Sequence, residues 1–228
     1  MTIIIARHGE TMNNLPDPSL HTVDPDLNAR GLAQARLLGE RFAGVHIDAL
    51  IASPLLRALR TAHELSIRKN NMPVRVLHEL VEIGTDYTTL THAGALEICP
   101  AALPFEHIPI AGDYGDGYAL EIRDEYYSLA RAHRVISLLR QFYPEDSTVL
   151  LVGHGAFNQR LIAAALRTSF PPDFIFSQDN TGVSAVNYRL SDDCRRPGDD
   201  VPRPGGGKRE VTRLVMMNDT SHLYGVSL

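Results

Sequence analysis

The chain has 228 residues, of which 44% are hydrophobic, and it carries a formal net charge of −5. This apolar content is ample for a buried core, and we expect a single domain over residues 1–228. The negative charge gives no general attraction to nucleic acid or to anionic membranes, so neither is expected as a partner. The two cysteines, Cys99 and Cys194, cannot form a disulfide framework and lack the spacing of metal ligands.

Neither a signal peptide nor a membrane span is expected from the sequence. The amino terminus lacks a basic stretch followed by a long apolar core, and no apolar run approaches the roughly 18 residues that a span requires. We therefore expect a soluble protein of a reducing compartment, the cytoplasm.

The predicted elements alternate between strands and helices along the chain. The predicted strands are Thr2–Ala6, Ala49–Ala52, Val74–Val76, Thr148–Val152, Val183–Arg189 and Val211–Met217. The predicted helices are Ala29–Ala43, a segment that starts at Ser53 and Pro54, Tyr118–Tyr143 and Ala156–Leu166. This order predicts an α/β fold with helices on both faces of a sheet. The last two strands have no helix between them and are expected to be antiparallel to a neighbour.

Three further features follow from these patterns. Ser53 is expected to cap a helix whose first position is Pro54, which would place Arg57 one turn into that helix. The helix Tyr118–Tyr143 is expected to face inward with one set of apolar residues: Leu120, Tyr127, Ala130, Val135, Leu138 and Phe142. Residues 192–208 are rich in Gly, Pro, Asp and Arg, so they predict a flexible surface loop.

Two of the predicted strands end in a His-Gly turn. Arg7, His8 and Gly9 follow the first strand, and His154 and Gly155 follow the fourth. Because open α/β sheets bind ligands at the carboxyl edge of their strands, both imidazoles are expected at one pocket. The arginine beside the first turn indicates that the ligand is a phosphate dianion.

The residue types in this pattern suit phosphoryl transfer. A neutral His8 can attack phosphorus if its other ring nitrogen donates to a backbone carbonyl. Arg7 and Arg57 can bind phosphate oxygens bidentately, and a protonated His154 would add a third cation. The Gly155 amide at a helix start and the side-chain amide of Asn14 are further candidate donors. These cations neutralise the transferred group, so we expect neither a metal nor a cofactor.

A leaving alkoxide also needs a proton. Glu82 is the best candidate for the general acid, because a nearby dianion favours the protonated carboxyl and the same group can later activate water. Glu79 lies three residues earlier and competes for this role, and the sequence does not decide between them.

The same residues resemble the histidine phosphatase superfamily, which includes cofactor-dependent phosphoglycerate mutases and many small-molecule phosphatases. The resemblance is carried by the segments Ile3–Asn14, Leu27–Ala35, Ser53–Thr61, Leu80–Gly84 and Leu150–Gly155. It implies a phosphoglycerate mutase-like, three-layer α/β/α sandwich with a mostly parallel central sheet. It also implies that Arg7, His8, Arg57 and His154 form the phosphate pocket, with His8 as the phosphorylated nucleophile and Glu82 near the position of the acid.

The composition of the segment after the predicted acid distinguishes between two reactions of this family, phosphate hydrolysis and mutase-type transfer. By resemblance, residues 84–118 form a lid over the site, and mutases carry basic residues there for a second phosphate and a carboxylate. Between Val76 and Ile122 the chain has no Lys or Arg, whereas eight Asp and Glu residues occur there. Like charges would repel a second anionic group, so hydrolysis of a single phosphate is favoured.

The sequence therefore predicts a histidine acid-type phosphatase that hydrolyses a small phosphorylated metabolite and releases inorganic phosphate. Mutase-type phosphoryl transfer and a non-catalytic phosphate-binding domain are the alternatives. The sequence leaves open the substrate and whether the chain forms a homodimer.

Overall fold

The computed structural model describes residues 1–84, 92–105, 125–168, 176–191 and 209–225. The strands are β1 Thr2–Arg7, β2 Ala49–Ala52, β3 Val74–Val76, β4 Ala102–Pro104, β5 Thr148–Gly153, β6 Val183–Ser191 and β7 Arg209–Asp219. The helices are α1 Ala29–Phe42, α2 Leu56–Arg68, α3 His92–Ile98, α5 Glu125–Phe142 and α6 Gly155–Leu166. Short 3₁₀ turns include η1 Met12–Asn14 and η3 His78–Leu80.

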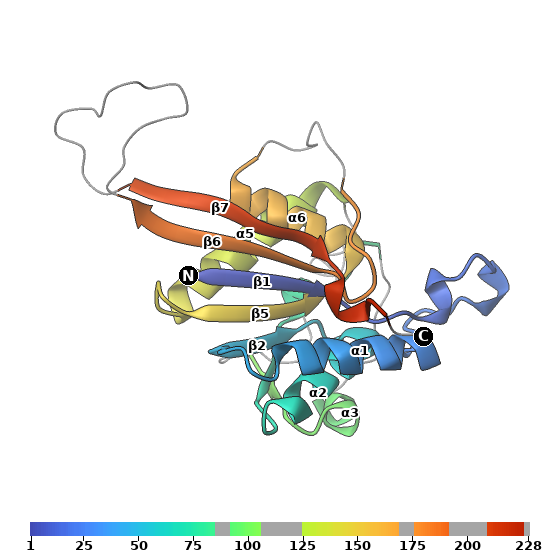
Figure 1. The fold of residues 1–228 in the computed structure, drawn as a ribbon. Helices are drawn as coiled ribbons and strands as arrows, with labels where there is room; N and C mark the ends of the chain where they lie inside the picture. Colours follow the sequence, from blue (N-terminus) through green and yellow to red (C-terminus); the bar gives the residue numbers. More distant parts are fainter. Residues whose placement is uncertain (85–91, 106–124, 169–175, 192–208, 226–228) are drawn as a thin grey trace, which may run out of the picture.

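The strands form one seven-stranded sheet in the order β4-β3-β2-β5-β1-β6-β7. The five strands from β4 to β1 are parallel. β6 is antiparallel to β1, and β7 is antiparallel to β6, as the arrows of these three strands show in Figure 1. This arrangement confirms the expected mostly parallel sheet and the antiparallel placement of the last two strands. It also sets β1 between β5 and β6, in the middle of the fold.

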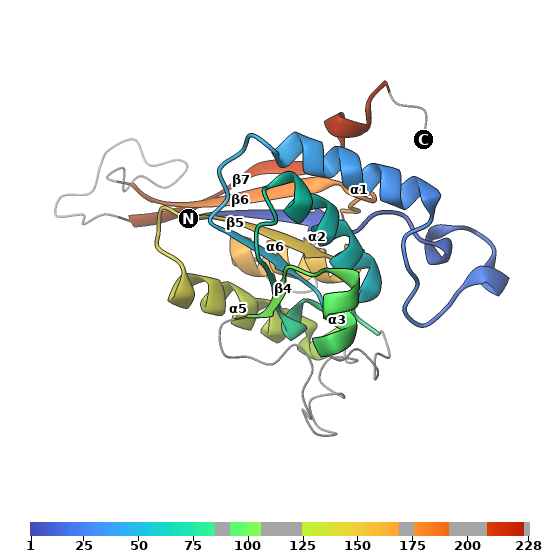
Figure 2. The same cartoon turned by 90° about the horizontal axis from the view of Figure 1, so that it is seen from below.

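Helices cover both faces of the sheet and give the predicted three layers (Figure 2). Ile3 and Ile5 of β1 pack in one core cluster with residues of α5 and α6. Ile4 and Ala6 point the other way and pack in a second cluster with residues of α1, α2 and α3. Successive strand side chains point to opposite faces, so a strand buried on both faces has a continuous apolar sequence.

The helix predicted from Ser53 starts later than expected. α2 begins at Leu56, and its N-cap residue is Leu55, whose side chain makes no capping bond. Ser53 accepts a hydrogen bond from the backbone N–H of Leu55 at 3.3 Å, so it shapes the turn before the helix. Arg57 is therefore the second helical residue, in the first turn of α2 and not one turn into the helix as predicted.

The predicted inward face of α5 was partly wrong. Val135 is buried and Leu138 partly buried as expected, but Tyr127, Ala130 and Phe142 are exposed. Two polar residues on this helix, Ser128 and Arg131, are fully buried, and the hydrophobic pattern included neither. The buried side of the helix instead includes Arg131, whose guanidinium donates to the carbonyls of Glu79 and Val81. Residues 118–124 of the predicted helix lie outside the described residues.

Two elements were not predicted at all. α3 and β4 lie within residues 84–118, and Ala95 of α3, Ala102 of β4 and Cys99 between them are part of the buried core. This part of the predicted lid therefore belongs to the body of the fold. The rest of the lid and the whole 192–208 loop lie outside the described residues, and both stay predictions.

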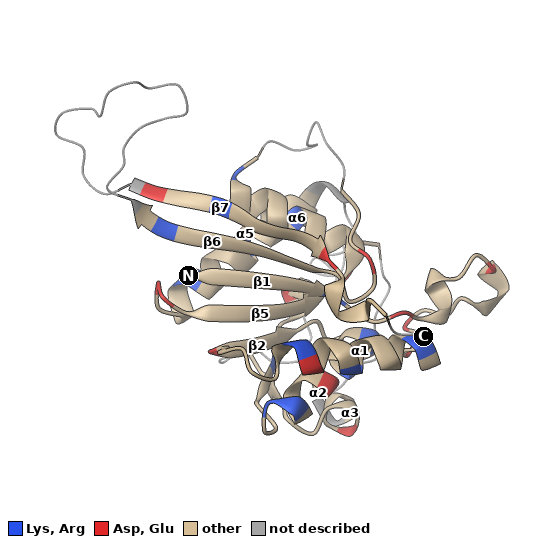
Figure 3. Ribbon diagram, viewed as in Figure 1, with Lys and Arg blue, Asp and Glu red and all other residues tan. Residues whose placement is uncertain are grey.

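Charges of both signs occur together on the outer helices α1 and α2, as Figure 3 shows. On α2, Arg68 pairs with the buried Glu64 one turn earlier at 2.7 Å, a spacing at which side chains on a helix meet. In the described part of the chain, no helix is both long and apolar enough to cross a membrane.

Candidate active site

Three neighbouring strands bring the predicted residues to one edge of the sheet. β1 and β5 pair in parallel with Arg7 opposite Gly153, so the two His-Gly turns leave the sheet side by side. The ladder continues past the strands, since His8 donates from its backbone to the Gly153 carbonyl at 3.0 Å. β2 lies on the other side of β5, and its end places Ser53 beside His154.

His8 is buried and its ring is held at both nitrogens. Nδ1 lies 2.7 Å from the carbonyl oxygen of Gly9, and Nε2 lies 3.2 Å from Nε of Arg57, which can only donate. Nδ1 therefore carries the proton and Nε2 carries the lone pair. Burial, followed by the charges of Arg57 and Arg7, holds the pKa of His8 well below its ordinary value. The ring is thus a neutral base whose Nε2 faces the cations, as a nucleophile on phosphorus requires.

His154 lies next to His8, and their ring centroids are 5.2 Å apart. Its Nε2 contacts the hydroxyl of Ser53 at 2.7 Å, and its Nδ1 has no hydrogen-bond partner within the described residues. Burial, followed by the positive charges of the nearby arginines Arg57 and Arg7, keeps the pKa of His154 well below its usual range. These influences favour the neutral form of His154, whereas a bound dianion would favour its protonation, so its role as a third cation stays a prediction.

The two arginines come from different elements and meet at this edge. Arg57 is nearly buried at the start of α2, and its Nη1 pairs with Asp24 at 3.2 Å. Arg7 ends β1 and donates from Nη1 to the carbonyl of Gln178 at 2.7 Å, while its Nε has no partner in the described part of the chain. A side chain in place of Gly155 would stand 3.4 Å from Arg7 Nε, so the glycine lets the guanidinium lie against the start of α6.

Glu82 follows η3 in the chain, and its side chain reaches the start of α6, the helix that begins directly after His154. Its carboxylate accepts from the backbone N–H of Ala156 at 3.2 Å and of Phe157 at 2.9 Å. The charge of Glu82 also opposes the burial that lowers the pKa of Arg7 and of Arg57, so it is close to both cations. Glu79 makes no comparable side-chain contact with the site among the described residues, and its carbonyl accepts instead from Arg131 at 3.0 Å. The geometry favours Glu82 over Glu79 as the acid.

Asn14 lies at the rim and is exposed. Its side-chain oxygen accepts from the backbone of Thr11 at 2.9 Å and from the amide of Asn180 at 3.2 Å. The same Asn180 amide lies 3.1 Å from the His8 carbonyl. Asn14 thus supports the loop after His8, and its predicted role as a phosphate donor stays a prediction.

The turn after β1 is fixed by close backbone packing. Gly9 donates to the hydroxyl of Thr61 on α2 at 3.0 Å, and a Cβ on Gly9 would stand 2.4 Å from the Gly31 carbonyl oxygen. A Cβ on Gly31 would stand 2.0 Å from the Glu10 carbonyl oxygen. Because neither glycine has a side chain, the turn after His8 packs directly against the start of α1. This close packing holds the His8 ring in place.

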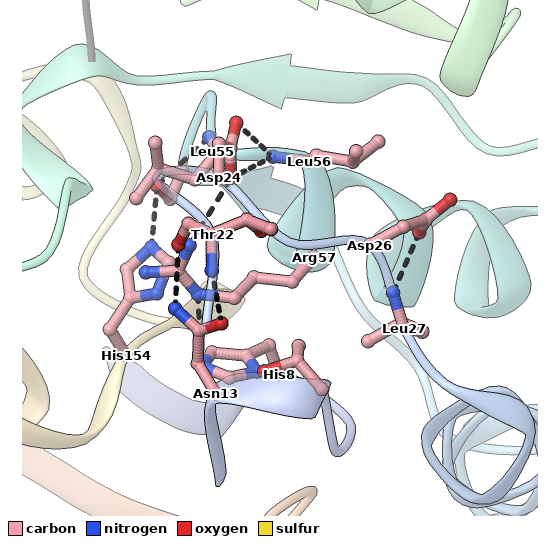
Figure 4. A network of polar contacts seen from close by, with 12 residues as sticks. His8, Asn13, Thr22, Asp24, Asp26, Leu27, Leu55, Leu56, Arg57 and His154 are labelled. Carbon is pink, nitrogen blue, oxygen red and sulfur yellow. Dashed lines mark hydrogen bonds and ion pairs between the residues drawn. The ribbon is translucent and has the colours of Figure 1, made fainter. Parts of the chain in front are cut away.

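Sequence reasoning missed three residues around the site. Asp24 holds Arg57, Ser53 contacts His154 where a helix cap was expected, and Arg131 holds the segment that carries Glu82. Figure 4 shows His8, His154 and Arg57 converging, with Asp24 over the start of α2. In the described residues, no cluster of three or more His, Cys, Asp or Glu has the arrangement of a metal site.

A family model described as the histidine phosphatase superfamily (branch 1) matches residues 3–193. The chain belongs to the histidine phosphatase superfamily. This match confirms the resemblance noted from the sequence motifs. Arg7, His8, Arg57 and His154, which meet at the edge of the sheet, all lie in those motifs.

Relatives of this histidine phosphatase superfamily member include both phosphatases and mutases. Phosphoserine phosphatase 1 of Hydrogenobacter thermophilus is 38% identical over 68 residues, which are 30% of this chain and 32% of that protein. A 2,3-bisphosphoglycerate-dependent phosphoglycerate mutase of Brucella anthropi is 26% identical over 204 residues, which are 84% of this chain and 93% of the mutase. The chain thus spans about a third of the length of the Hydrogenobacter phosphatase that it matches.

A solved structure shares the fold over nearly the whole chain. The mycobacterial glucosyl-3-phosphoglycerate phosphatase, solved in complex with VO3, aligns with a TM-score of 0.61 at 23% identity. The alignment covers 95% of this chain and 98% of that one. At this identity the likeness establishes the fold, and the reaction and the substrate have to be argued from the site.

Proposed function

We propose that the chain is a phosphomonoester hydrolase that works through a phosphohistidine on His8 and needs no metal ion. The observation that carries the proposal is the meeting of a neutral, correctly oriented imidazole with two arginines and a second histidine at one sheet edge. Two guanidiniums supply the permanent positive charge that a transferred phosphoryl group requires.

The first step is attack by the Nε2 lone pair of His8 on phosphorus. The hydrogen bond from Arg57 Nε to His8 Nε2 has to be given up as this bond forms, and a phosphate oxygen is the natural new acceptor. The bond between phosphorus and the leaving oxygen breaks, and the leaving alkoxide takes a proton from Glu82. The proton stays on Nδ1, which donates a hydrogen bond to the Gly9 carbonyl, and this bond stabilises the positive charge that His8 gains.

The second step is hydrolysis of the phosphohistidine. The Glu82 carboxylate removes a proton from water as the water oxygen attacks phosphorus, and the bond between phosphorus and Nε2 breaks. Inorganic phosphate is released, and both His8 and the protonated Glu82 are restored. The backbone amides of Ala156 and Phe157 hydrogen-bond to the Glu82 carboxylate and hold it at the start of α6 for both steps.

The proposed substrate is a metabolite with one phosphate on a neutral or weakly cationic body, such as a sugar or a nucleoside. Its support is the composition of the segment between Val76 and Ile122, which has eight acidic residues and no Lys or Arg. A panel of phosphorylated metabolites with released phosphate as the readout tests this class. Faster turnover of bisphosphoglycerate or phytate than of neutral monoesters would contradict it.

Hydrolysis itself is tested with p-nitrophenyl phosphate and the variants His8→Ala and His46→Ala. His46 is exposed and pairs with Asp48, which makes it a matched control. We expect the parent and His46→Ala to release nitrophenol at similar rates and His8→Ala to lose activity by about a thousandfold or more. Equal turnover by the parent and His8→Ala would contradict the mechanism, and no turnover by the parent would favour a phosphate-binding domain.

Mutase-type transfer is the second candidate, because a relative that aligns over most of this chain is a phosphoglycerate mutase. The test supplies 3-phosphoglycerate with a catalytic amount of 2,3-bisphosphoglycerate and compares isomerisation with phosphate release. We expect phosphate release to dominate. Isomerisation that outpaces it would establish the mutase reaction instead.

A further inference from the structure

Asp24 reaches the site from the connection between η1 and α1. Both of its carboxylate oxygens lie 3.1 Å from the backbone nitrogen of Leu56, and one lies 3.2 Å from Nη1 of Arg57. The Asp24 side chain is 26% exposed and that of Arg57 is 9% exposed. The contact is thus mostly shielded from water, where an ion pair constrains geometry more than at the open surface.

Asp24 substitutes for a cap that α2 lacks in its own sequence. The N-cap residue Leu55 has no side chain that can accept, and the hydroxyl of Ser53 contacts His154 instead of the first helical amides. A carboxylate at this point satisfies a free amide and interacts favourably with the positive end of the helix. Asp24 therefore fixes the start of the helix that carries Arg57.

The same carboxylate also fixes the arginine itself. Arg57 is held at Nε by His8 and at Nη1 by Asp24, so its guanidinium plane has two anchors. When Nε of Arg57 leaves His8 and donates to a phosphate oxygen instead, the contact between Nη1 and Asp24 still holds the guanidinium. A guanidinium that is already oriented loses little conformational entropy when it binds phosphate. An arginine without such a contact would have to be ordered in the transition state.

We propose that Asp24 is a positioning residue that orients Arg57 toward the transferred phosphoryl group. This inference rests on the phosphatase function proposed above. Asp24 touches no reacting atom in this scheme and acts only through Arg57. A neighbouring ion pair of the same kind provides the comparison, because Asp26 pairs with Arg60 one turn further along α2 at 3.1 Å, in a much more exposed position.

The test compares Asp24→Asn with the matched control Asp26→Asn, using p-nitrophenyl phosphate for kcat and KM and inorganic phosphate as a competitive inhibitor. Asparagine keeps an oxygen for the Leu56 amide but removes the charge that holds Arg57. We expect kcat to fall by at least about tenfold in Asp24→Asn, while its inhibition constant for phosphate stays the same or falls because a nearby negative charge is gone. Asp26→Asn should keep both values within about twofold of the parent.

A double-mutant cycle with Arg57→Ala separates positioning from general damage. If Asp24 acts through Arg57, then adding Asp24→Asn to Arg57→Ala lowers kcat by less than about twofold. Full additivity of the two effects would overturn the proposal. So would a kcat of Asp24→Asn near that of the parent, a loss of phosphate affinity as large as the loss of kcat, or failure of Asp24→Asn to fold when Asp26→Asn folds.

The outcomes also separate this inference from the function on which it rests. A parent protein that releases no phosphate from any monoester ends the proposed function and the inference together. A parent that hydrolyses monoesters, with Asp24→Asn indistinguishable from it, ends the inference alone.

Discussion

Arg57 donates from Nε to Nε2 of His8 at 3.2 Å. A positively charged side chain therefore binds the same lone pair of His8 that attacks phosphorus in the proposed mechanism. This contact requires a neutral imidazole, because a protonated ring has no acceptor. The pocket is therefore held ready for an anion by two permanent cations and a neutral base.

The first prediction concerns the charge of His8. Burial and the two arginines lower its pKa, so the ring stays neutral as the pH falls through the ordinary value of 6.5. In an NMR titration, the His8 imidazole resonance, identified by its loss in His8→Ala, should show the neutral form at pH 6.5, where an ordinary histidine is half protonated. Titration of that resonance at or above 6.5 would show that the arginines do not control the ring.

The second prediction concerns Ser53, whose hydroxyl orients His154. Ser53→Ala removes that contact and should lower kcat by about ten- to a hundredfold, because His154 loses the partner that fixes its ring. Ser66→Ala is the control, since Ser66 is also a buried serine on this side of the sheet and donates to the Met72 carbonyl at 2.7 Å. It should cost about 1 kcal/mol of stability with kcat unchanged. Equal kcat values for the two variants would contradict a role for Ser53 in orienting His154.

The third prediction concerns Arg131, the fully buried arginine of α5. Its Nη1 donates to the carbonyls of Glu79 and Val81, on the chain just before Glu82, and its guanidinium lies 3.9 Å from the Phe157 ring centroid. Arg131→Leu should lower the free energy of unfolding by about 3 kcal/mol, because two buried carbonyls lose a charged donor.

Denaturant unfolding measures this change, with the exposed Arg134→Leu as the matched control on the same helix. The control should change the free energy of unfolding by less than about 1 kcal/mol. A similar small change in Arg131→Leu would mean that the segment carrying Glu82 is held by other contacts.

The fourth prediction is a pH dependence of stability from His222. Its Nε2 lies 3.0 Å from the Thr181 hydroxyl, and Arg41 Nη1 lies 3.3 Å from its Nδ1. Burial, followed by the charge of Arg41, lowers the pKa of His222 from 6.5 to about 4, although Asp219 opposes the shift. Between these two values the unfolded chain binds a proton that the folded protein does not, so folding becomes less favourable as the pH falls.

The measurement compares the parent with His222→Gln at pH 7 and near pH 4. The stability that neutral His222 contributes is complete above its unfolded pKa and is lost as the pH falls toward its folded pKa. Because the ring is only partly buried, we expect the parent to lose about 1–2 kcal/mol more than the variant over this range. A difference between the two proteins that does not change with pH would contradict the assignment.

Local sequence patterns predicted the centre of the site well. His8 and His154 each follow a short apolar strand, and parallel strands that end in similar turns bring those turns to the same edge. Arg57 was placed near that edge from the Ser53-Pro54 turn, although the helix itself starts at Leu56. The positions of these residues at the ends of their elements could be predicted because each depends on neighbours within one element, whereas the roles given to them stay predictions.

The contacts that were missed join segments far apart in the chain. The pairing of Asp24 with Arg57 depends on the path of a loop that has no periodic pattern, and the burial of Arg131 depends on carbonyls of a different element. The helix α3 contains Gly94 and the strand β4 ends at Pro104, so weak propensity hid both. Tertiary packing decides such features, and a single sequence contains no direct signal for them.

The central claim is that His8 carries the phosphoryl group during turnover, and trapping that intermediate tests it most directly. The parent, His8→Ala and His46→Ala are mixed with a labelled phosphomonoester, quenched in base within one turnover, and the modified peptide is identified by mass spectrometry. We predict a phosphoryl group on the His8 peptide of the parent and of His46→Ala, and none in His8→Ala. A parent that turns over without label on His8, or label that persists in His8→Ala, would contradict the account.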